Sequence, residues 1–273
     1  MMTINCKGQL IDLSTPKVMG ILNLTPDSFY DGGQYRDEKD ILTQVKKMLD
    51  DGATFIDIGA YSSRPGATHI SEDEELKRIV PIVKLLCQTF PDILISIDTF
   101  RSQVAKACIE SGAALINDIS AGEMDDNMFQ TIGTLNIPYI MMHMQGTPQN
   151  MQQNPTYKNV TQDILLYFSK KIALARQYNI NDIIIDPGFG FGKTIAHNYA
   201  LLNDLEVFKN INLPILIGAS RKSMIYNILN TNAQNALNGT TVVNTLALHK
   251  GASIIRVHDV KEAVECVTLV NQL

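Results

Sequence analysis

The 273-residue sequence is poor in the residues and segments that mark several classes of protein. Its cysteines, Cys6, Cys87, Cys108 and Cys266, are far apart, and the chain has no Cys-x-x-Cys pair and no histidine at metal-ligand spacing. These absences argue against a disulfide framework or a zinc site and favour buried thiols in a reducing compartment. The first residues lack the apolar core of a signal peptide, and no run approaches the roughly 18 apolar residues of a membrane span. We therefore expect a cytoplasmic protein with no membrane partner.

The sequence also lacks an excess of basic residues over acidic ones. The formal net charge is -5, so a broad basic surface for nucleic acid is not indicated, and any bound anion must be held locally. No linker or low-complexity repeat divides the chain, which is 45% hydrophobic and 19% charged. Because α/β barrels of about 250 residues are commonly one domain, residues 1–273 are expected to form a single domain.

Polar residues stand at the end of nearly every strand-like apolar run. In chain order they are Asn23, Asp98, Asn117-Asp118, His143, Asp186, the Gly218-Ala219-Ser220-Arg221-Lys222 turn and Arg256-Val257-His258-Asp259, while Asp57 lies within the run from Phe55 to Ile58. Such runs, alternating with helical patterns, predict a (β/α)8 TIM barrel whose functional groups gather at the C-terminal rim.

Start and stop signals define the remaining elements. The segment from Ile4 to Leu13, broken at Lys7-Gly8, is typical of a hairpin that could plug the bottom of the barrel. Helices are expected at 37–51, 71–90 with an irregularity at Pro81, 102–111, 127–135, 160–178, 196–208, 239–250 and 261–273.

Three of the strand-end residues suit a flat heterocycle. Asp98, Asn117 and Asp186 offer two carboxylates and an amide on fixed strand ends, as needed to bind the N–C–N edge of a pterin or guanine. The alternative is that each acid only caps the next helix or pairs with a nearby cation.

Cations follow the last two strands. Lys222, Arg256 and His258 lie where barrels frequently bind phosphate, and they would suit a diphosphate leaving group. Surface Lys and Arg are more often simply solvated, which remains the competing interpretation. Asn23 could present its amide oxygen to Mg²⁺ shared with substrate phosphates.

The glycine-rich segment 187–194 fails as a P-loop, because the first required glycine would fall at Pro187. It is better interpreted as a tight turn near a ligand, with Phe189 or Phe191 available to stack on a ring, although a purely structural turn is the alternative. Two long loops, 25–36 and 60–70, contain Gly and Pro hinges and polar side chains that could order over a ligand.

Eight segments together resemble the dihydropteroate synthase family, in family order and over essentially the whole chain. They are Asn23-Leu24-Thr25-Pro26-Asp27-Ser28-Phe29, Ser63-Arg64-Pro65-Gly66, Ile97-Asp98-Thr99, Asn117-Asp118-Ile119-Ser120, Met142-His143-Met144-Gln145-Gly146-Thr147-Pro148, Asp186-Pro187-Gly188-Phe189-Gly190-Phe191, Ser220-Arg221-Lys222-Ser223 and Arg256-Val257-His258-Asp259.

The resemblance implies transfer of a dihydropterin-methyl group from its diphosphate to 4-aminobenzoate, giving 7,8-dihydropteroate and diphosphate, with Mg²⁺ as cofactor and a homodimer as the assembly. It implies a catalytic set of Asp31, Asp98, Lys222 and Arg256, and a pterin pocket of Asp98, Asn117, Met142, Asp186, Phe191, Gly218 and Lys222. It also implies diphosphate binding by Asn23, Ser63, Arg256 and His258, metal binding by Asn23, and aminobenzoate binding by Phe29, Asp31, Ser63, Arg64, Pro65 and Ser223.

The chemistry inferred from the residues is compatible with this resemblance. Loss of diphosphate leaves a cation delocalised over the dihydropterin, so an SN1-like path needs no protein nucleophile, and no Ser-His or Cys-His pairing is evident.

The chain departs from the family's usual Gly-Gly-Glu-Ser-Thr-Arg-Pro-Gly at Ala60, Tyr61 and Ser63, which affects the expected packing of aminobenzoate and of sulfonamide analogues. Two alternatives are a methyltransferase that moves a methyl group from methyltetrahydrofolate to a corrinoid protein and a non-catalytic pterin-binding paralogue. The apolar positions Ile225, Ile228 and Leu229 are candidates for a dimer interface.

Overall fold

Eight parallel strands form the centre of the molecule. The computed structural model describes residues 2–24, 34–62 and 69–273. The strands of the central sheet are β3 (Lys17–Asn23), β4 (Phe55–Gly59), β5 (Ile95–Asp98), β6 (Leu115–Asp118), β7 (Tyr139–Met142), β8 (Ile183–Asp186), β9 (Leu216–Ile217) and β10 (Ile254–Val257). They lie in the order β8-β7-β6-β5-β4-β3-β10-β9, and a parallel bridge between Ile185 and Ile215 joins the two ends. The predicted barrel is therefore confirmed as a nearly closed one.

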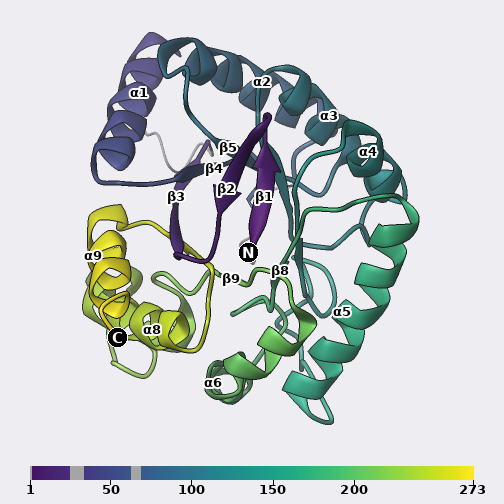
Figure 1. Ribbon diagram of the computed structural model, residues 1–273. Helices are drawn as coiled ribbons and strands as arrows, with labels where there is room; N and C mark the ends of the chain where they lie inside the picture. Colours follow the sequence, from purple (N-terminus) through teal and green to yellow (C-terminus); the bar gives the residue numbers. More distant parts are fainter. Residues whose placement is uncertain (1, 25–33, 63–68) are drawn as a thin grey trace.

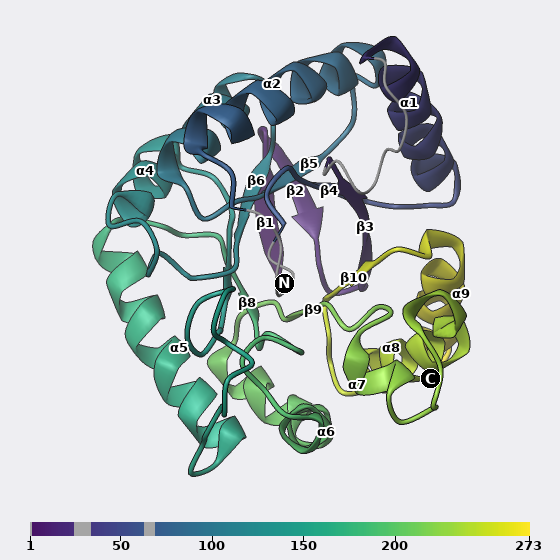
Figure 2. The same cartoon turned by 180° about the vertical axis from the view of Figure 1, so that it is seen from behind.

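Helices surround these strands in a ring (Figure 1), and the view from behind shows the short helix α7 beside α8 (Figure 2). The helices are α1 (Gln34–Asp50), α2 (Glu72–Thr89), α3 (Ser102–Glu110), α4 (Met128–Leu135), α5 (Val160–Gln177), α6 (Ile195–Asn203), α7 (Ser223–Tyr226), α8 (Leu237–His249) and α9 (Val260–Val270), with 3-10 turns at Leu205–Ile211 and Ala233–Asn235. None of the described helices combines the length and apolar character needed to cross a membrane.

The helix predictions are largely confirmed, with one correction. The helix expected at 196–208 ends at Asn203 and gives way to a 3-10 turn, because Asp204 turns its carboxylate to the Thr161 hydroxyl at 2.8 Å. Pro81 lies within α2 without ending it, and Ser71 caps that helix by accepting a hydrogen bond from the Glu74 amide, as the sequence predicts.

Successive side chains of each strand point alternately toward the helices and into the barrel, and this alternation divides the core into two clusters. Val18, Leu22, Ile56 and Ile58 belong to the large cluster that packs against the helices. Their neighbours Met19, Phe55, Leu115, Ile140, Ile184, Leu216 and Ile254 form a second cluster inside the barrel, at the N-terminal end of the strands. Because the side-chain period of a strand is two, the next inward position on each strand lies one layer closer to the C-terminal rim.

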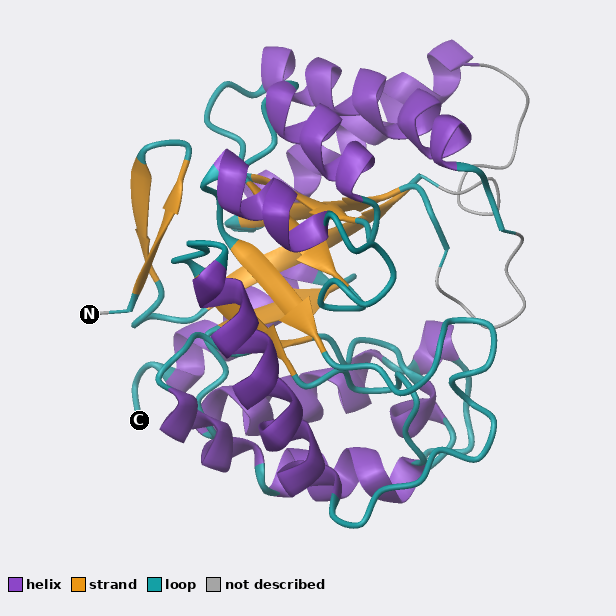
Figure 3. Ribbon diagram, turned by 90° about the vertical axis from the view of Figure 1, so that its right-hand side faces the viewer, coloured by secondary structure: helices purple, strands orange, loops and turns teal. Residues whose placement is uncertain are grey.

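The N-terminal hairpin closes the bottom of the barrel. It consists of β1 (Thr3–Cys6) and β2 (Gln9–Asp12), which pair antiparallel. Ile4, Cys6, Ile11 and Leu13 join the interior cluster. In Figure 3 the hairpin stands at the end of the barrel from which the strands start. The predicted plug is confirmed, and it leaves the opposite rim as the open end.

The plug predicts a difference between two hairpin substitutions. Ile4→Ala should lower the free energy of unfolding by about 2–5 kcal/mol, because it opens a cavity in the interior cluster. Leu10→Ala on the same hairpin, where the side chain is 70% exposed, should change it by less than about 0.5 kcal/mol. Denaturant titration of both variants checks this, and equal effects would contradict the plug.

Candidate active site

A cavity of about 830 Å³ opens at the C-terminal ends of the strands. Its wall contains side chains from every strand of the barrel or from the turn that follows it. Among the residues that line it are Asn23, Tyr61, Asp98, Asn117, Met142, Asp186, Phe191, Gly218, Ser220, Lys222, Ser223, Arg256 and His258. The structure thus brings together the strand-end residues that the sequence singles out.

The floor of the cavity is the inward layer above the apolar plug. Asp57, Asp98, Asn117 and Arg256 occupy inward positions on β4, β5, β6 and β10, and Asp98 is paired in register with Asn117. Gly59 leaves room for this layer, since a Cβ there would lie 3.3 Å from Cβ of Asp98. One layer of the barrel therefore carries the charged groups while the layer beneath it is apolar.

Arg256 joins two carboxylates across the floor. Its Nε donates to Asp57 Oδ2 at 2.6 Å, and its Nη2 donates to Asp98 Oδ2 at 2.8 Å. Asn117 Nδ2 donates to the same Asp57 oxygen at 3.1 Å. Asp57 is fully buried, and its second oxygen has no hydrogen-bond partner among the described residues. The structure thus places Asp57 at the centre of the site.

Burial shifts the pKa values of the groups on this floor. Desolvation raises the pKa of Asp98 to about 7, opposed by the positive charge of Arg256 and reinforced by the negative charge of Asp57. Burial also raises the pKa of Asp186, while Lys222 acts in the opposite direction. The pKa of Lys222 falls to about 8, again chiefly through desolvation. The site therefore contains an acid and a base whose charges change near neutral pH.

Lys222 lies against the glycine-rich turn after β8. Its ammonium group donates to the Phe189 carbonyl and lies 4.4 Å from the centre of the Phe191 ring. Gly190, at φ +81°, allows this approach, because a Cβ there would come within 3.1 Å of the Lys222 side chain. Phe191 lines the cavity, whereas Phe189 is buried in the core and is unavailable for stacking.

Lys193 explains why this segment looks like a P-loop. Its ammonium group points back into its own turn and donates to the carbonyls of Gly188 at 2.9 Å and Phe191 at 3.0 Å. It also lies 3.0 Å from Nδ1 of the buried His143. The lysine therefore stabilises the turn and does not face the cavity as a phosphate ligand would.

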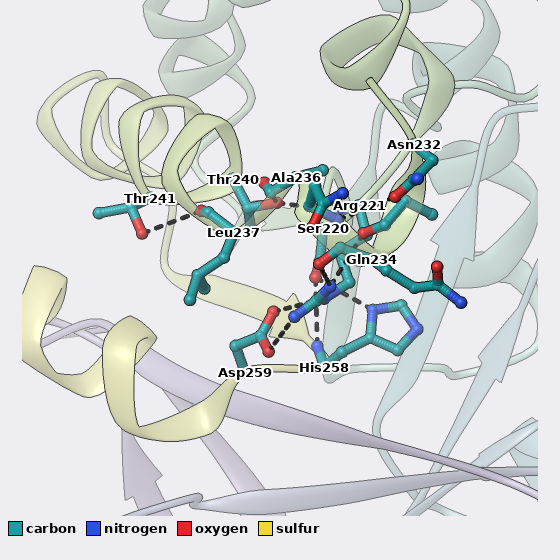
Figure 4. Close-up of polar contacts among 12 residues, drawn as sticks. Ser220, Arg221, Asn232, Gln234, Ala236, Leu237, Thr240, Thr241, His258 and Asp259 are labelled. Carbon is teal, nitrogen blue, oxygen red and sulfur yellow. Dashed lines mark hydrogen bonds and ion pairs between the residues drawn. The ribbon is translucent and has the colours of Figure 1, made fainter. Parts of the chain in front are cut away.

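The turn after β9 and the end of β10 form a second polar corner (Figure 4). Ser220 Oγ lies 3.0 Å from His258 Nδ1 and accepts a hydrogen bond from the His258 amide at 3.2 Å. Arg221 makes a bidentate pair with Asp259 at 2.8 and 2.7 Å and donates to the carbonyls of Ala233 and Gln234. Arg221 thus fixes the turn, and His258 faces the cavity beside Arg256.

Tyr61 forms part of the outer wall. Its ring meets Phe100 edge to face at 5.0 Å, and Arg101 Cζ lies 5.4 Å from the ring centre. Gln149 Nε2 donates to its hydroxyl at 3.2 Å. Arg101 is itself held by the buried Glu75 at 2.5 Å. Tyr61, one of the three residues that depart from the family pattern, is therefore packed into the structure at the edge of the cavity.

The remaining predicted site residues lie outside the described part of the chain. They are Phe29, Asp31, Ser63, Arg64 and Pro65. Tyr61, Asp57 and Lys193 were not predicted as site or wall residues. The sequence does contain a signal for Asp57. It lies two residues before the end of β4, and strand periodicity places it on the same face as the last residue, Gly59.

Comparison with known proteins decides the family. A model of the pterin-binding enzyme family matches residues 19–258. Dihydropteroate synthase from Escherichia coli K12 is 43% identical over 271 residues, which covers 98% of this chain and 95% of that protein. The chain belongs to the dihydropteroate synthase family. That family consists of transferases, and the predicted activity is supported by these full-length relatives.

Other relatives agree. Dihydropteroate synthase from Haemophilus influenzae is 44% identical over 261 residues, covering 95% of this chain and 94% of that protein. A Yersinia pestis dihydropteroate synthase solved with a sulfonamide drug complex superposes with a TM-score of 0.93 at 44% identity, covering 99% of this chain and 98% of that one. The Xanthomonas albilineans dihydropteroate synthase solved with 4-aminobenzoic acid superposes with a TM-score of 0.92 at 33% identity, covering 99% of this chain and 97% of that one. These likenesses favour the synthase over the methyltransferase alternative.

The pKa values predict a bell-shaped dependence of pterin affinity on pH. Binding of a pterin without a diphosphate should strengthen as pH rises through about 7, where Asp98 becomes an ionised acceptor, and weaken above about 8, where Lys222 loses its charge. Calorimetric titration across this range measures it. In Lys222→Met the alkaline limb should disappear, and an affinity that is flat from about pH 5.5 to 9.5 would contradict the assignment.

Proposed function

We propose that this chain condenses (7,8-dihydropterin-6-yl)methyl diphosphate with 4-aminobenzoate, using the residues of the cavity floor in the roles given below. The observation that supports this assignment best is the Arg256 bridge between Asp57 and Asp98, next to Asn117. It places acceptors for a heterocycle and a cation for a leaving group within one cavity.

The pterin would lie on the floor. Asp98, Asp186 and Asn117 supply acceptors for its amino and ring N–H groups, and Lys222 supplies a donor for a ring oxygen or nitrogen. Met142, Gly218 and Phe191 line the same cavity and offer apolar contact to the ring faces. A Cβ at Gly218 would lie 3.9 Å from Arg256 and 4.0 Å from Asp186, so a side chain there would take space between these two groups.

The diphosphate would bind at the Arg256 and His258 corner. Arg256 has five N–H donors, and only two of them are used by Asp57 and Asp98, which leaves three for phosphate oxygens. These donors stabilise the negative charge that develops as the carbon–oxygen bond to diphosphate breaks.

The residues of this corner also fit a magnesium ion. The Asn23 side chain lines the cavity and makes no hydrogen bond to another described residue, so its amide oxygen can serve as a ligand. No cluster of three acidic, His or Cys side chains is found among the described residues, which is compatible with an ion held mainly by substrate phosphates. When bound, Mg²⁺ would neutralise charge on the diphosphate.

The reaction would follow an SN1-like path. As diphosphate departs, positive charge spreads from the exocyclic methylene carbon into the dihydropterin ring, where the carboxylate of Asp98 stabilises it. The amine of 4-aminobenzoate then forms the new carbon–nitrogen bond and releases a proton. Ser223 lines the cavity where this amine would enter, whereas Phe29, Asp31, Ser63, Arg64 and Pro65 keep their predicted roles from the family resemblance.

Replacement of Asp98 tests this role. Asp98→Asn keeps the shape and one acceptor but removes the charge, so turnover should fall by at least about 10²-fold while pterin affinity falls less. Steady-state rates and calorimetric pterin binding separate the two effects. Unchanged turnover would contradict the proposal.

The overall reaction has its own test. The purified protein should form dihydropteroate, identified by mass, only when both substrates are present, and pterin binding without product would favour the non-catalytic alternative.

We also propose a cytoplasmic homodimer. Ile228 and Leu229 are 56% and 52% exposed, as the predicted interface requires, but Ile225 is 2% exposed and cannot contribute. Leu229 approaches α8 at Gly239, whose face also carries the exposed Val242 and Leu246. Together Ile228, Leu229, Val242 and Leu246 form an apolar patch that a second copy could cover.

The apolar patch predicts the outcome of a charge substitution. The double variant Ile228→Asp and Leu229→Asp should sediment as a monomer, because two carboxylates would be desolvated in the interface. Leu166→Asp on α5, where the side chain is 58% exposed, is the matched control and should leave the mass unchanged. A dimer that survives the double substitution would rule out this patch.

A further inference from the structure

Asp57 determines which end of the Asn117 amide faces the cavity. Asp57 Oδ2 accepts hydrogen bonds from Arg256 Nε at 2.6 Å and from Asn117 Nδ2 at 3.1 Å. A carboxylate paired with a guanidinium has only acceptors to offer. The amide must therefore turn its NH2 group toward Asp57, and the reversed orientation would place two oxygens against each other.

The amide oxygen is then available to a ligand. Asn117 lines the cavity, and no described residue donates a hydrogen bond to its Oδ1. Its register partner Asp98 and the nearby Asp186 also present oxygens to the same cavity. The floor thus offers three acceptor groups side by side, and the acceptor character of the third depends on Asp57.

The burial of Asp57 is not explained by stability. Its Oδ1 is buried with no hydrogen-bond partner among the described residues, and so is Oγ of Ser96, its register partner on β5. Unsatisfied buried polar atoms destabilise a fold, and buried ion pairs are commonly no better than apolar residues of similar volume. Stability alone therefore gives no reason for a carboxylate at this position, whereas its contacts with Arg256 and Asn117 point to the site.

We propose that Asp57 is a positioning residue that fixes Asn117 as a hydrogen-bond acceptor and so makes the pocket select a 2-amino heterocycle over its 2-oxo counterpart. An amino group donates to Asn117 Oδ1 and the carboxylates, whereas a carbonyl at that position brings oxygen against oxygen. This inference rests on the proposed pterin pocket and extends it from the residues that touch the ligand to the one that orients them.

Binding of a matched ligand pair tests the proposal. The probes are 6-hydroxymethylpterin and 6-hydroxymethyllumazine, which differ in an amino group and a carbonyl at the same ring position and carry no diphosphate. The unsubstituted protein should prefer the pterin by at least about 10²-fold. In Asp57→Asn the amide of residue 117 is free to reverse, so this preference should fall at least about tenfold.

Asp118→Asn is the matched control. Asp118 is as deeply buried as Asp57, on strand β6, which β5 separates from β4. It bonds Ser120, Gly122 and Tyr139 and not a cavity residue. This variant should lose stability and keep the pterin preference. If Asp57 were only structural, Asp57→Asn would likewise lose stability and keep the pterin preference. The ratio of pterin affinity to lumazine affinity therefore separates a structural role from a positioning role.

Each remaining outcome decides a question. An unchanged ratio in folded Asp57→Asn would overturn the proposal. If that variant does not fold, Asn117→Ala removes the acceptor directly, and an unchanged ratio there would overturn it equally. Failure of the unsubstituted protein to bind the pterin at all would instead refute the proposed function, because the inference concerns selection between two ligands and not binding itself.

Discussion

The bridge that Arg256 makes between Asp57 and Asp98 is the interaction on which the site depends. Two carboxylates at the top of a barrel repel each other and are poorly solvated, and the guanidinium between them makes their coexistence possible. The same cation remains partly available to an anion, and the same Asp57 oxygen holds the amide of Asn117. One buried cluster therefore connects the heterocycle end of the cavity to the phosphate end.

The barrel supports this cluster by separating apolar and polar layers. Below it, the hairpin residues and the first inward residues of the strands form an apolar plug that excludes water from beneath. Charges above such a plug interact through a medium of low polarizability, which strengthens both their attraction and their pKa shifts. The N-terminal hairpin thus affects the electrostatics of a cavity at the other end of the strands.

Much of this arrangement could be predicted from the sequence, because strand periodicity and strand-end polarity are local signals. The barrel, the hairpin plug and the gathering of Asp98, Asn117, Asp186 and Arg256 follow from them. Contacts between distant strands do not. The pairing of Asp57 with Arg256 requires the curvature and near-closure of the barrel, and the inward direction of Lys193 requires the carbonyls of a folded turn. The break at Asp204 depends likewise on a partner, Thr161, on another helix.

The near-closure of the barrel also constrains how the chain can be made. β3 pairs with β10 along Val18 and Ile255, and the backbone amide of Lys17 donates to the Ser253 carbonyl at 2.9 Å. Synthesis proceeds from the N-terminus, so the first strand of the barrel leaves the ribosome long before its partner exists. Until then one edge of the sheet remains unpaired. The Arg256 bridge is carried by the last strand of the barrel, so the binding floor forms only after the residues up to Arg256 have been translated.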